Sequence, residues 1–323
     1  FIPPPAPPGR PGGKGPFNED LMPNAQGFSY FFGTPMHNGF TKDVDLRRFV
    51  VELMRNGEVV ESPANTDELT KTYTNEALKF IRDNKDRPFF ILLSHNMPHV
   101  PLAVSDDFRG KSVRGLYGDA IEEIDWSVGQ VVSELANLEL ERDTLVIFLS
   151  DNGPEVRAEL ENDVGSAGAL RGGKYSNWEG GVRVPAIFSW PGTLTPKTIS
   201  EGFFALMDIF PTVAALAGGD GPERYTLDGV NILPLLLNDE SEYRPRPSYF
   251  YYSLTSLQAV RMDHWKLVLP RKKNSPYLLW LGKYMDTVDN PMLFNLKLDV
   301  SEQNDLSSKR QDIVAKMLLE AKR

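Results

Sequence analysis

The stretch Thr144 to Pro185, TLVIFLSDNGPEVRAELENDVGSAGALRGGKYSNWEGGVRVP, decides the fold. It opens with an uninterrupted apolar run, Leu145 to Leu149, of the kind found in strands buried on both faces. The run stops at Asp151 and Asn152, so a carboxylate and an amide oxygen follow the carboxyl end of the predicted strand. In open α/β sheets ligands bind at this edge, and such oxygens suit a hard cation such as Ca²⁺ or Mg²⁺.

The second half of this stretch favours an anion site. Six glycines within 165–181 surround Arg171 and Lys174, and glycine permits the tight turns needed to fold around a small anion, with Lys174 as a point charge. Two other interpretations compete. Asn-Gly after a strand is commonly a simple turn. Residues 168–174 nearly match the phosphate-binding pattern G-x-x-x-x-G-K, but Tyr175 replaces the Ser/Thr and no strand directly precedes the segment, so a nucleotide site is rejected.

A second polar cluster follows another apolar run. Phe89 to Leu93 reads as a buried strand, and His95 and His99 come directly after it. Histidines four residues apart share one face of a helix and can bind zinc, but Pro98 and Pro101 exclude a helix here. Polar side chains therefore gather where each predicted strand ends.

The order of the predicted elements favours an α/β fold. Amphipathic helices are predicted over Thr66 to Asp83 and Tyr117 to Leu138, each before one of the two strands, which is typical of a parallel sheet. Adjacent residues of a helix point apart, so Glu122 and Glu123 are expected on its solvated face. Antiparallel pairs are expected around Asn56-Gly57 and near the carboxyl terminus. The further predicted elements are strands at 49–54, 58–61, 186–190, 249–254, 257–262, 265–269 and 292–296, and helices at 203–217 and 308–322.

Composition excludes several classes of protein. The 323 residues carry a net charge of −9 and no compensating block of Lys and Arg, which argues against a nucleic-acid partner. No apolar run is long enough for a membrane span, and the absence of cysteine excludes disulfides and thiolate metal sites. The proline-rich opening, 1–16, is expected to be extended. Any site for an anionic ester must be locally positive against the global charge.

The ordered motifs S-D-N-G-P, L-R-G-G-K and W-E-G-G-V-R-V-P resemble the sulfatase family, in its arylsulfatase A-like branch of the alkaline phosphatase superfamily. The resemblance implies that Asp151 and Asn152 bind calcium and that Lys174 binds the sulfate ester. His99, in a Pro-His-x-Pro context, matches the histidine that contacts the sulfate or protonates the leaving oxygen, whereas a structural role is favoured for His95. The implied fold is α/β, with an alkaline phosphatase-like central sheet flanked by helices and a small antiparallel C-terminal sheet.

The resemblance covers only the later part of a sulfatase. It implies a catalytic domain at 1–244 that lacks its N-terminal portion, and a C-terminal subdomain at 245–323. The C/S-x-P-S-R motif that yields the formylglycine nucleophile is absent from the sequence, as are the family's early Asp-Asp pair and its later Lys-x-His segment. Asp106-Asp107 does not end a strand and is not assigned to calcium. We therefore expect a truncated sequence that is inactive alone, because positioning and charge stabilisation cannot replace the covalent step.

The expected activity is hydrolysis of sulfuric esters, on a small-molecule or carbohydrate substrate, in a bacterial periplasmic or secreted protein. Two alternatives stay open. One is a phosphate or phosphonate ester hydrolase of the same superfamily, which would favour two transition metals over a single hard cation. The other is a non-catalytic binder of sulfated glycans, in which the anion pocket survives without a nucleophile. The substrate depends on loop geometry that the sequence does not fix.

Overall fold

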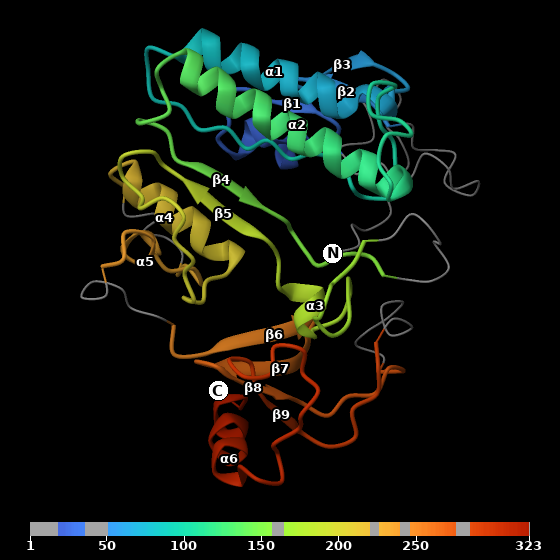
Figure 1. Cartoon of the computed structure of the whole chain (residues 1–323), viewed down its shortest axis with the longest axis vertical. Helices are drawn as coiled ribbons and strands as arrows, with labels where there is room; N and C mark the ends of the chain where they lie inside the picture. The colour runs from blue at the N-terminus through green and yellow to red at the C-terminus, as the bar shows by residue number, and fades with distance from the viewer. Residues whose placement is uncertain are drawn as a thin grey trace. The chain divides into compact units, whose positions relative to one another are not determined.

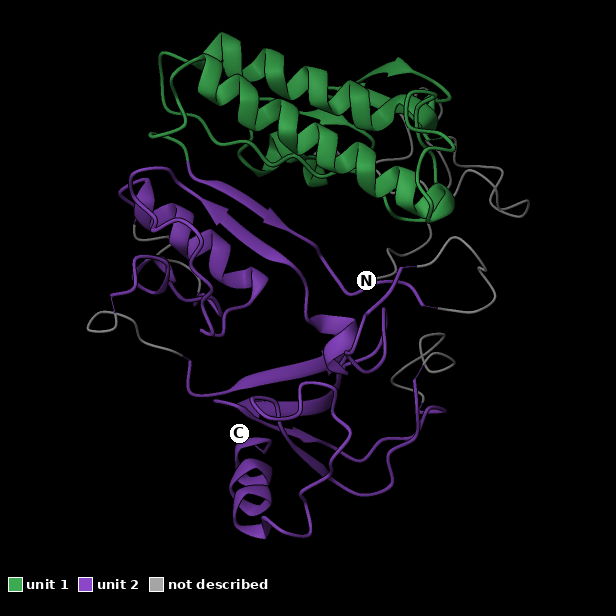
Figure 2. Ribbon diagram, in the orientation of Figure 1, with its two compact units in different colours: residues 1–144, 158–164 green, residues 145–157, 165–323 purple. Residues whose placement is uncertain are grey.

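The structure is a computed structural model, and it describes residues 19–35, 51–156, 165–219, 226–239, 246–275 and 285–322. The proline-rich opening expected to be extended lies outside these residues. The chain forms two compact units (Figure 2), the first made of Phe1–Thr144 with Ala158–Val164 and the second of Leu145–Arg157 with Gly165–Arg323. The domain boundary expected at 244/245 stays a prediction.

The first unit contains a three-stranded antiparallel sheet. Its strands, in the order β1-β2-β3, are Phe32–Gly33, Leu53–Arg55 and Glu58–Glu61. The predicted hairpin is confirmed, because Asn56 and Gly57 adopt φ values of 50° and 90° between β2 and β3. These left-handed values suit a two-residue hairpin turn, and Asn-Gly tolerates them well.

Two helices accompany this sheet, α1 at Leu69–Asn84 and α2 at Gly115–Asn137, and they lie side by side in Figure 1. Both were predicted within a few residues. A short 3₁₀ turn precedes α1, where the Asn65 side chain accepts a hydrogen bond from the Asp67 amide at 3.2 Å. This hydrogen bond caps the 3₁₀ turn, whereas α1 itself starts at Leu69 without a side-chain cap.

The solvated position predicted for Glu123 is wrong. Its side chain is fully buried, and its Oε2 atom accepts a hydrogen bond from the Ser105 amide at 3.2 Å. Asp119 is also buried and accepts hydrogen bonds from the amides of the 110–112 loop, at 2.7 to 3.0 Å. The apolar spacing of α2 could not reveal this, because the partners are backbone amides of an irregular segment that covers the helix.

The strand predicted at Phe89 to Leu93 does not form within the described residues. Phe90 and Leu92 are 54% and 66% exposed, which is unusual for an apolar run of this length. Composition favours a strand here, but a strand also requires a neighbour whose backbone groups are unpaired. All strand pairs of the described residues are antiparallel, so the expected parallel pairing has no counterpart among them.

The second unit opens with β4, Val146–Leu149, which pairs with β5, Ala186–Ser189. Both strands were predicted, but β4 is only partly buried and Ile187 of β5 is 60% exposed, so the expected burial on both faces is not observed. Three helices follow in this unit, α3 at Glu179–Val182, α4 at Ile209–Leu216 and α5 at Leu233–Leu236. The predicted helix at 203–217 is thus shorter, and it begins after a 3₁₀ turn.

The C-terminal part of this unit is a four-stranded antiparallel sheet, as predicted. Its order is β6-β7-β8-β9, with strands at Tyr249–Ser253, Ser256–Met262, Trp265–Val268 and Met292–Asn295. The terminal helix α6, Gln311–Glu320, packs against the sheet (Figure 1). Their shared core contains Val260, Leu267, Leu293 and Met317.

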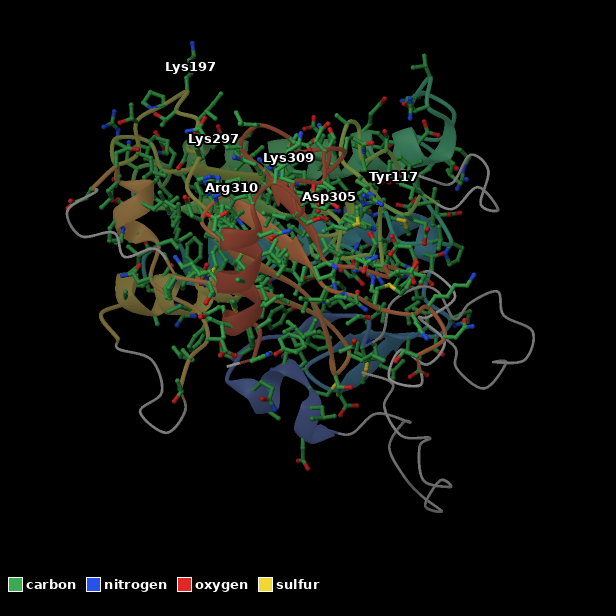
Figure 3. The ribbon with its side chains drawn as sticks, turned by 90° about the horizontal axis from the view of Figure 1, so that it is seen from below. Tyr117, Lys197, Lys297, Asp305, Lys309 and Arg310 are labelled. Carbon is green, nitrogen blue, oxygen red and sulfur yellow. The ribbon has the colours of Figure 1, made fainter. Side chains whose placement is uncertain are left out.

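Polar side chains of the segment just before α6 contact the C-terminal sheet. Figure 3 labels Asp305, Lys309 and Arg310 just before this helix. Asp305 accepts a hydrogen bond from the Leu293 amide of β9 at 3.0 Å, and the Arg310 guanidinium lies 5.2 Å from the Trp265 ring. Within the described residues we find no helical stretch with the length and hydrophobicity of a membrane span.

Candidate anion and metal site

The residues that follow β4 form a tight polar turn. The Ser150 hydroxyl donates to the Asn152 carbonyl at 3.0 Å, and the Asn152 side-chain amide donates to the Gly153 carbonyl at 3.0 Å. Because the Asn152 NH₂ group is engaged in this way, its Oδ1 atom is turned to the other side. Asp151 is exposed beside it. The turn therefore places a carboxylate and an amide oxygen directly after β4, and their role as metal ligands stays a prediction.

Glycines let the 171–181 segment fold against this turn. The Lys174 amide donates to the Pro154 carbonyl at 2.8 Å, and the Gly153 amide donates to the Gly181 carbonyl at 2.9 Å. A Cβ atom at Gly153 would lie 1.9 Å from the Gly180 carbonyl oxygen, which no side chain can do. The backbone contact thus requires glycine, and it brings Lys174 next to Asn152.

Lys174 and Asn152 line one pocket of about 300 Å³. The Lys174 ammonium lies 5.5 Å from the Tyr175 ring, and in the described part of the chain it has no carboxylate partner. An unpaired, half-buried ammonium attracts anions, more so in a partly desolvated pocket. Another wall comes from the C-terminal sheet, from Tyr252 and Ser253 at the end of β6 and from Leu254 directly after it; these three residues are called the β6–β7 turn below.

A buried ion triad supports the short helix that ends the glycine-rich segment. The Lys266 ammonium of β8 donates to Glu179 Oε1 at 2.9 Å and pairs with Glu302 Oε1 at 2.9 Å. Glu302 also accepts the Glu179 amide at 2.6 Å, and all three side chains are at most 2% exposed. Burial raises the pKa of the Glu302 carboxyl, and the ammonium of Lys266 opposes this shift. The triad ties the glycine-rich segment to the C-terminal sheet.

Arg171 belongs to this support and not to the anion pocket. Its guanidinium stacks on the Trp178 ring at 3.5 Å and donates to the Glu302 carbonyl at 3.1 Å. The Trp178 indole donates to Asp286 Oδ2 at 3.0 Å. Of Arg171 and Lys174, the two basic residues among the glycines, only Lys174 lines the pocket.

The two histidines lie in the first unit. His99 is half-buried, and its Nδ1 atom lies 2.6 Å from the Val100 carbonyl oxygen, an arrangement in which Nδ1 is the donor. His95 Nε2 lies 3.1 Å from the Ser127 hydroxyl, and burial lowers the pKa of His95 to about 4. A neutral, enclosed His95 agrees with the structural role expected for it.

The donor chemistry of Asp151 and Asn152 fits a hard cation, because no side-chain partner occupies their carboxylate and amide oxygens in the described part of the chain. Calcium takes six to eight oxygen ligands, so these two residues alone would supply only part of a calcium site. The described residues contain no cluster of three or more His, Cys, Asp or Glu suited to a metal. Asp107 of the Asp-Asp pair forms an ion pair with Lys71, and its carboxylate is exposed.

A lysine with no carboxylate partner among the described residues, placed beside hard oxygen atoms by a glycine-rich segment, has the chemistry to bind an anion. The chain matches the sulfatase family model over residues 10–219 and the model of the C-terminal region of aryl-sulfatase over residues 244–323. The chain therefore belongs to the sulfatase family.

Individual relatives agree with this assignment. The chain is 39% identical over 274 residues to steryl-sulfatase from Homo sapiens, with 79% of this chain and 47% of the relative covered. It resembles the crystal structure of the PsFucS1 sulfatase from Pseudoalteromonas sp. with a TM-score of 0.81 and 25% identity, covering 94% of this chain and 67% of that one. A structure of Ps i-CgsB in complex with k-i-k-neocarrahexaose gives a TM-score of 0.75 and 27% identity, covering 95% and 68%.

These comparisons confirm the predicted fold class, with its small antiparallel C-terminal sheet. The chain spans about half the length of the curated relatives it matches.

Sequence reasoning missed the pocket wall and the ion triad. The Tyr252 and Leu254 side chains reach the pocket from the β6–β7 turn, far along the chain from Lys174. Lys266 and Val268 lie on the same face of β8, and both are buried. A lysine on an apolar face of a strand could have indicated the ion triad from the sequence, since a buried lysine requires buried carboxylates as partners.

Proposed function

We propose that the protein containing this chain hydrolyses sulfate monoesters at the pocket of Asn152 and Lys174. One observation carries the proposal: Lys174 presents to a pocket an ammonium with no carboxylate partner among the described residues, although the chain has a net charge of −9. Its positive charge would hold the sulfate group and stabilise the charge that develops on it during the reaction. His99 would contact the sulfate or protonate the leaving oxygen from Nε2, with Nδ1 held by the Val100 carbonyl.

Calcium is the expected metal, with Asp151 and Asn152 among its ligands. A calcium ion held by these residues would supply positive charge beside the nucleophile. Replacing Asp151 with asparagine removes one negative charge and should weaken calcium binding at least tenfold, measured by calorimetry in the natural protein. Asp106→Asn is the matched control, since that carboxylate is exposed and far from β4 in sequence. Equal calcium affinity in both variants would exclude Asp151 as a ligand.

The nucleophile is expected to be a formylglycine in the part of the protein outside these 323 residues. The chain carries no cysteine and no Ser-x-Pro-Ser-Arg motif. The 323 residues alone should therefore show no turnover, because the covalent step has no group to perform it.

The substrate is expected to be a small-molecule or carbohydrate sulfate ester. Two proteins similar to this chain support this range of substrates: one is named steryl-sulfatase, and the other, Ps i-CgsB, was solved in complex with k-i-k-neocarrahexaose. A periplasmic or secreted location in a bacterium stays part of the proposal, supported by the family alone.

A panel of p-nitrophenyl esters tests the activity. The natural protein, loaded with calcium, should hydrolyse the sulfate ester much faster than the phosphate or phosphonate ester. Faster phosphonate hydrolysis with two bound transition-metal ions would instead establish the superfamily's other chemistry. Binding of a sulfated glycan with no turnover of any ester would establish a non-catalytic binder.

A further inference from the structure

The Lys174 pocket is larger than a sulfate group requires. A volume of about 300 Å³ is at the lower end of the range for small-molecule sites, whereas sulfate has only five heavy atoms. Lys174 and Asn152 account for the charged end. The remaining space is bounded by Asn177 and by the β6–β7 turn, so these residues face whatever the sulfate is attached to.

The β6–β7 turn presents apolar surface to this space. Tyr252 is 57% exposed, although its neighbours Tyr251 and Ser253 are only 5% and 9% exposed. Leu254, 42% exposed, has a φ of 51°, a left-handed value that hairpin turns require and that is uncommon for a bulky residue. The pairing register of β6 with β7 shifts between Tyr251 and Tyr252, and such irregularities re-aim side chains in β-sheets.

The polar groups around the Tyr252 ring can form hydrogen bonds with the hydroxyl groups of a ligand. The Asn177 side-chain amide donates to Gln258 Oε1 at 3.1 Å, and Gln258 is fully buried, so the orientation of Asn177 is fixed. Its Oδ1 atom is then an acceptor on the pocket side. The Tyr252 hydroxyl has no partner within the described residues, and Ser253 adds a second hydroxyl to the wall. A flat apolar ring flanked by fixed acceptors and hydroxyls matches a sugar, whose faces are apolar and whose edges are polar.

We propose that this wall is a sugar subsite: Tyr252 stacks on the ring of a carbohydrate sulfate ester while Asn177 accepts a hydrogen bond from one of its hydroxyls. The inference rests on the proposed sulfuric ester hydrolysis and adds the substrate class to it. A steroid sulfate fits less well, because its long apolar body would leave Asn177 and the wall hydroxyls buried without partners.

The test uses the natural protein and galactose 6-sulfate as the probe. Tyr252→Ala should raise KM on the order of tenfold with little change in kcat, because stacking acts on the bound ring and not on the reacting bond. Inhibition of Tyr252→Ala by inorganic sulfate should match that of the wild type, since the sulfate ion is expected to bind Lys174 and not the ring of Tyr252. Tyr252→Phe keeps the ring and should stay within threefold of wild type. Phe210→Ala is the matched control, because Phe210 is 56% exposed in the same unit and does not line the pocket.

Two results would overturn the sugar subsite. One is an unchanged KM for galactose 6-sulfate in Tyr252→Ala. The other is turnover of estrone sulfate but not of galactose 6-sulfate by the wild type. If the wild type hydrolyses no sulfate ester at all, the proposed function fails, and calorimetric binding of galactose 6-sulfate then decides the subsite separately. Weaker binding in Tyr252→Ala than in Phe210→Ala supports it, and equal binding refutes it.

Discussion

Replacing Lys266 with methionine removes the only ammonium of the buried triad. Glu179 and Glu302 are then left 2% and 0% exposed, without the partner that now lies 2.9 Å from each. Glu179 keeps Arg183 at 3.8 Å, but that guanidinium is 54% exposed and weakly coupled. Glu302 keeps one hydrogen bond from a backbone amide. Breaking a buried ion pair by removing one partner typically costs about 3–5 kcal/mol, and we expect a loss of unfolding free energy in this range at pH 7.

The loss of unfolding free energy in Lys266→Met should be larger at high pH than at low pH. Burial already raises the pKa of the Glu302 carboxyl, and Lys266, which opposes this shift, is absent from the variant, so the folded variant binds more protons than the unfolded chain. Its stability therefore recovers as the pH falls and drops as the pH rises toward the raised pKa of Glu302. The double variant Lys266→Met with Glu302→Gln removes one stranded charge and should recover at least half of the loss.

Urea unfolding at pH 5, 7 and 8 measures these free energies, and hydrogen exchange of the 171–182 amides reports the local effect. Lys272→Met is the matched control, because Lys272 is an exposed lysine of the same unit. A loss below about 1 kcal/mol that does not change with pH would refute the argument, since it is the size expected for a surface pair.

Further predictions concern His95 and two glycines. Because burial lowers the pKa of His95 to about 4, against about 6.5 for histidine in the unfolded chain, its neutral form stabilises the fold above pH 6.5, and about 3 kcal/mol should be lost as the pH falls toward 4. Urea titrations should show this dependence in wild type and not in His95→Leu. Gly180→Ala would place a Cβ atom 2.4 Å from the Gly172 carbonyl oxygen, so we expect a loss of about 1–3 kcal/mol and weaker sulfate binding. Gly129→Ala has open space around it in α2 and should raise stability by about 0.5–1 kcal/mol, and a loss there as large as in Gly180→Ala would contradict the packing argument.

Local chemistry made much of the fold predictable. The Asn56-Gly57 turn and the strands of the C-terminal sheet carry their signals within a few residues, and the structure confirms them. The failures involve partners distant in sequence. Phe89 to Leu93 has strand composition but no ladder neighbour among the described residues. Glu123 is buried because the amide of Ser105 reaches it.

The candidate site also contains residues that were predicted from local motifs and residues that were not. Asn152 and Lys174 were predicted from their motifs, and the structure places them in one pocket. Tyr252 was not predicted, because nothing near it in sequence indicates which pocket a hairpin turn approaches. The role of Lys266 was also hidden, since a lysine in a strand normally lies on the solvated face. Its burial depends on two carboxylates from separate segments.

The most direct measurement is the turnover of p-nitrophenyl sulfate by Lys174→Ala in the natural protein, beside Lys272→Ala. The account predicts that kcat/KM falls by at least about a hundredfold in Lys174→Ala, as when a group that stabilises transition-state charge is removed. Inhibition by inorganic sulfate should weaken in parallel, and Lys272→Ala should match wild type. Wild-type rates in Lys174→Ala would contradict the central claim that this lysine binds the sulfate group.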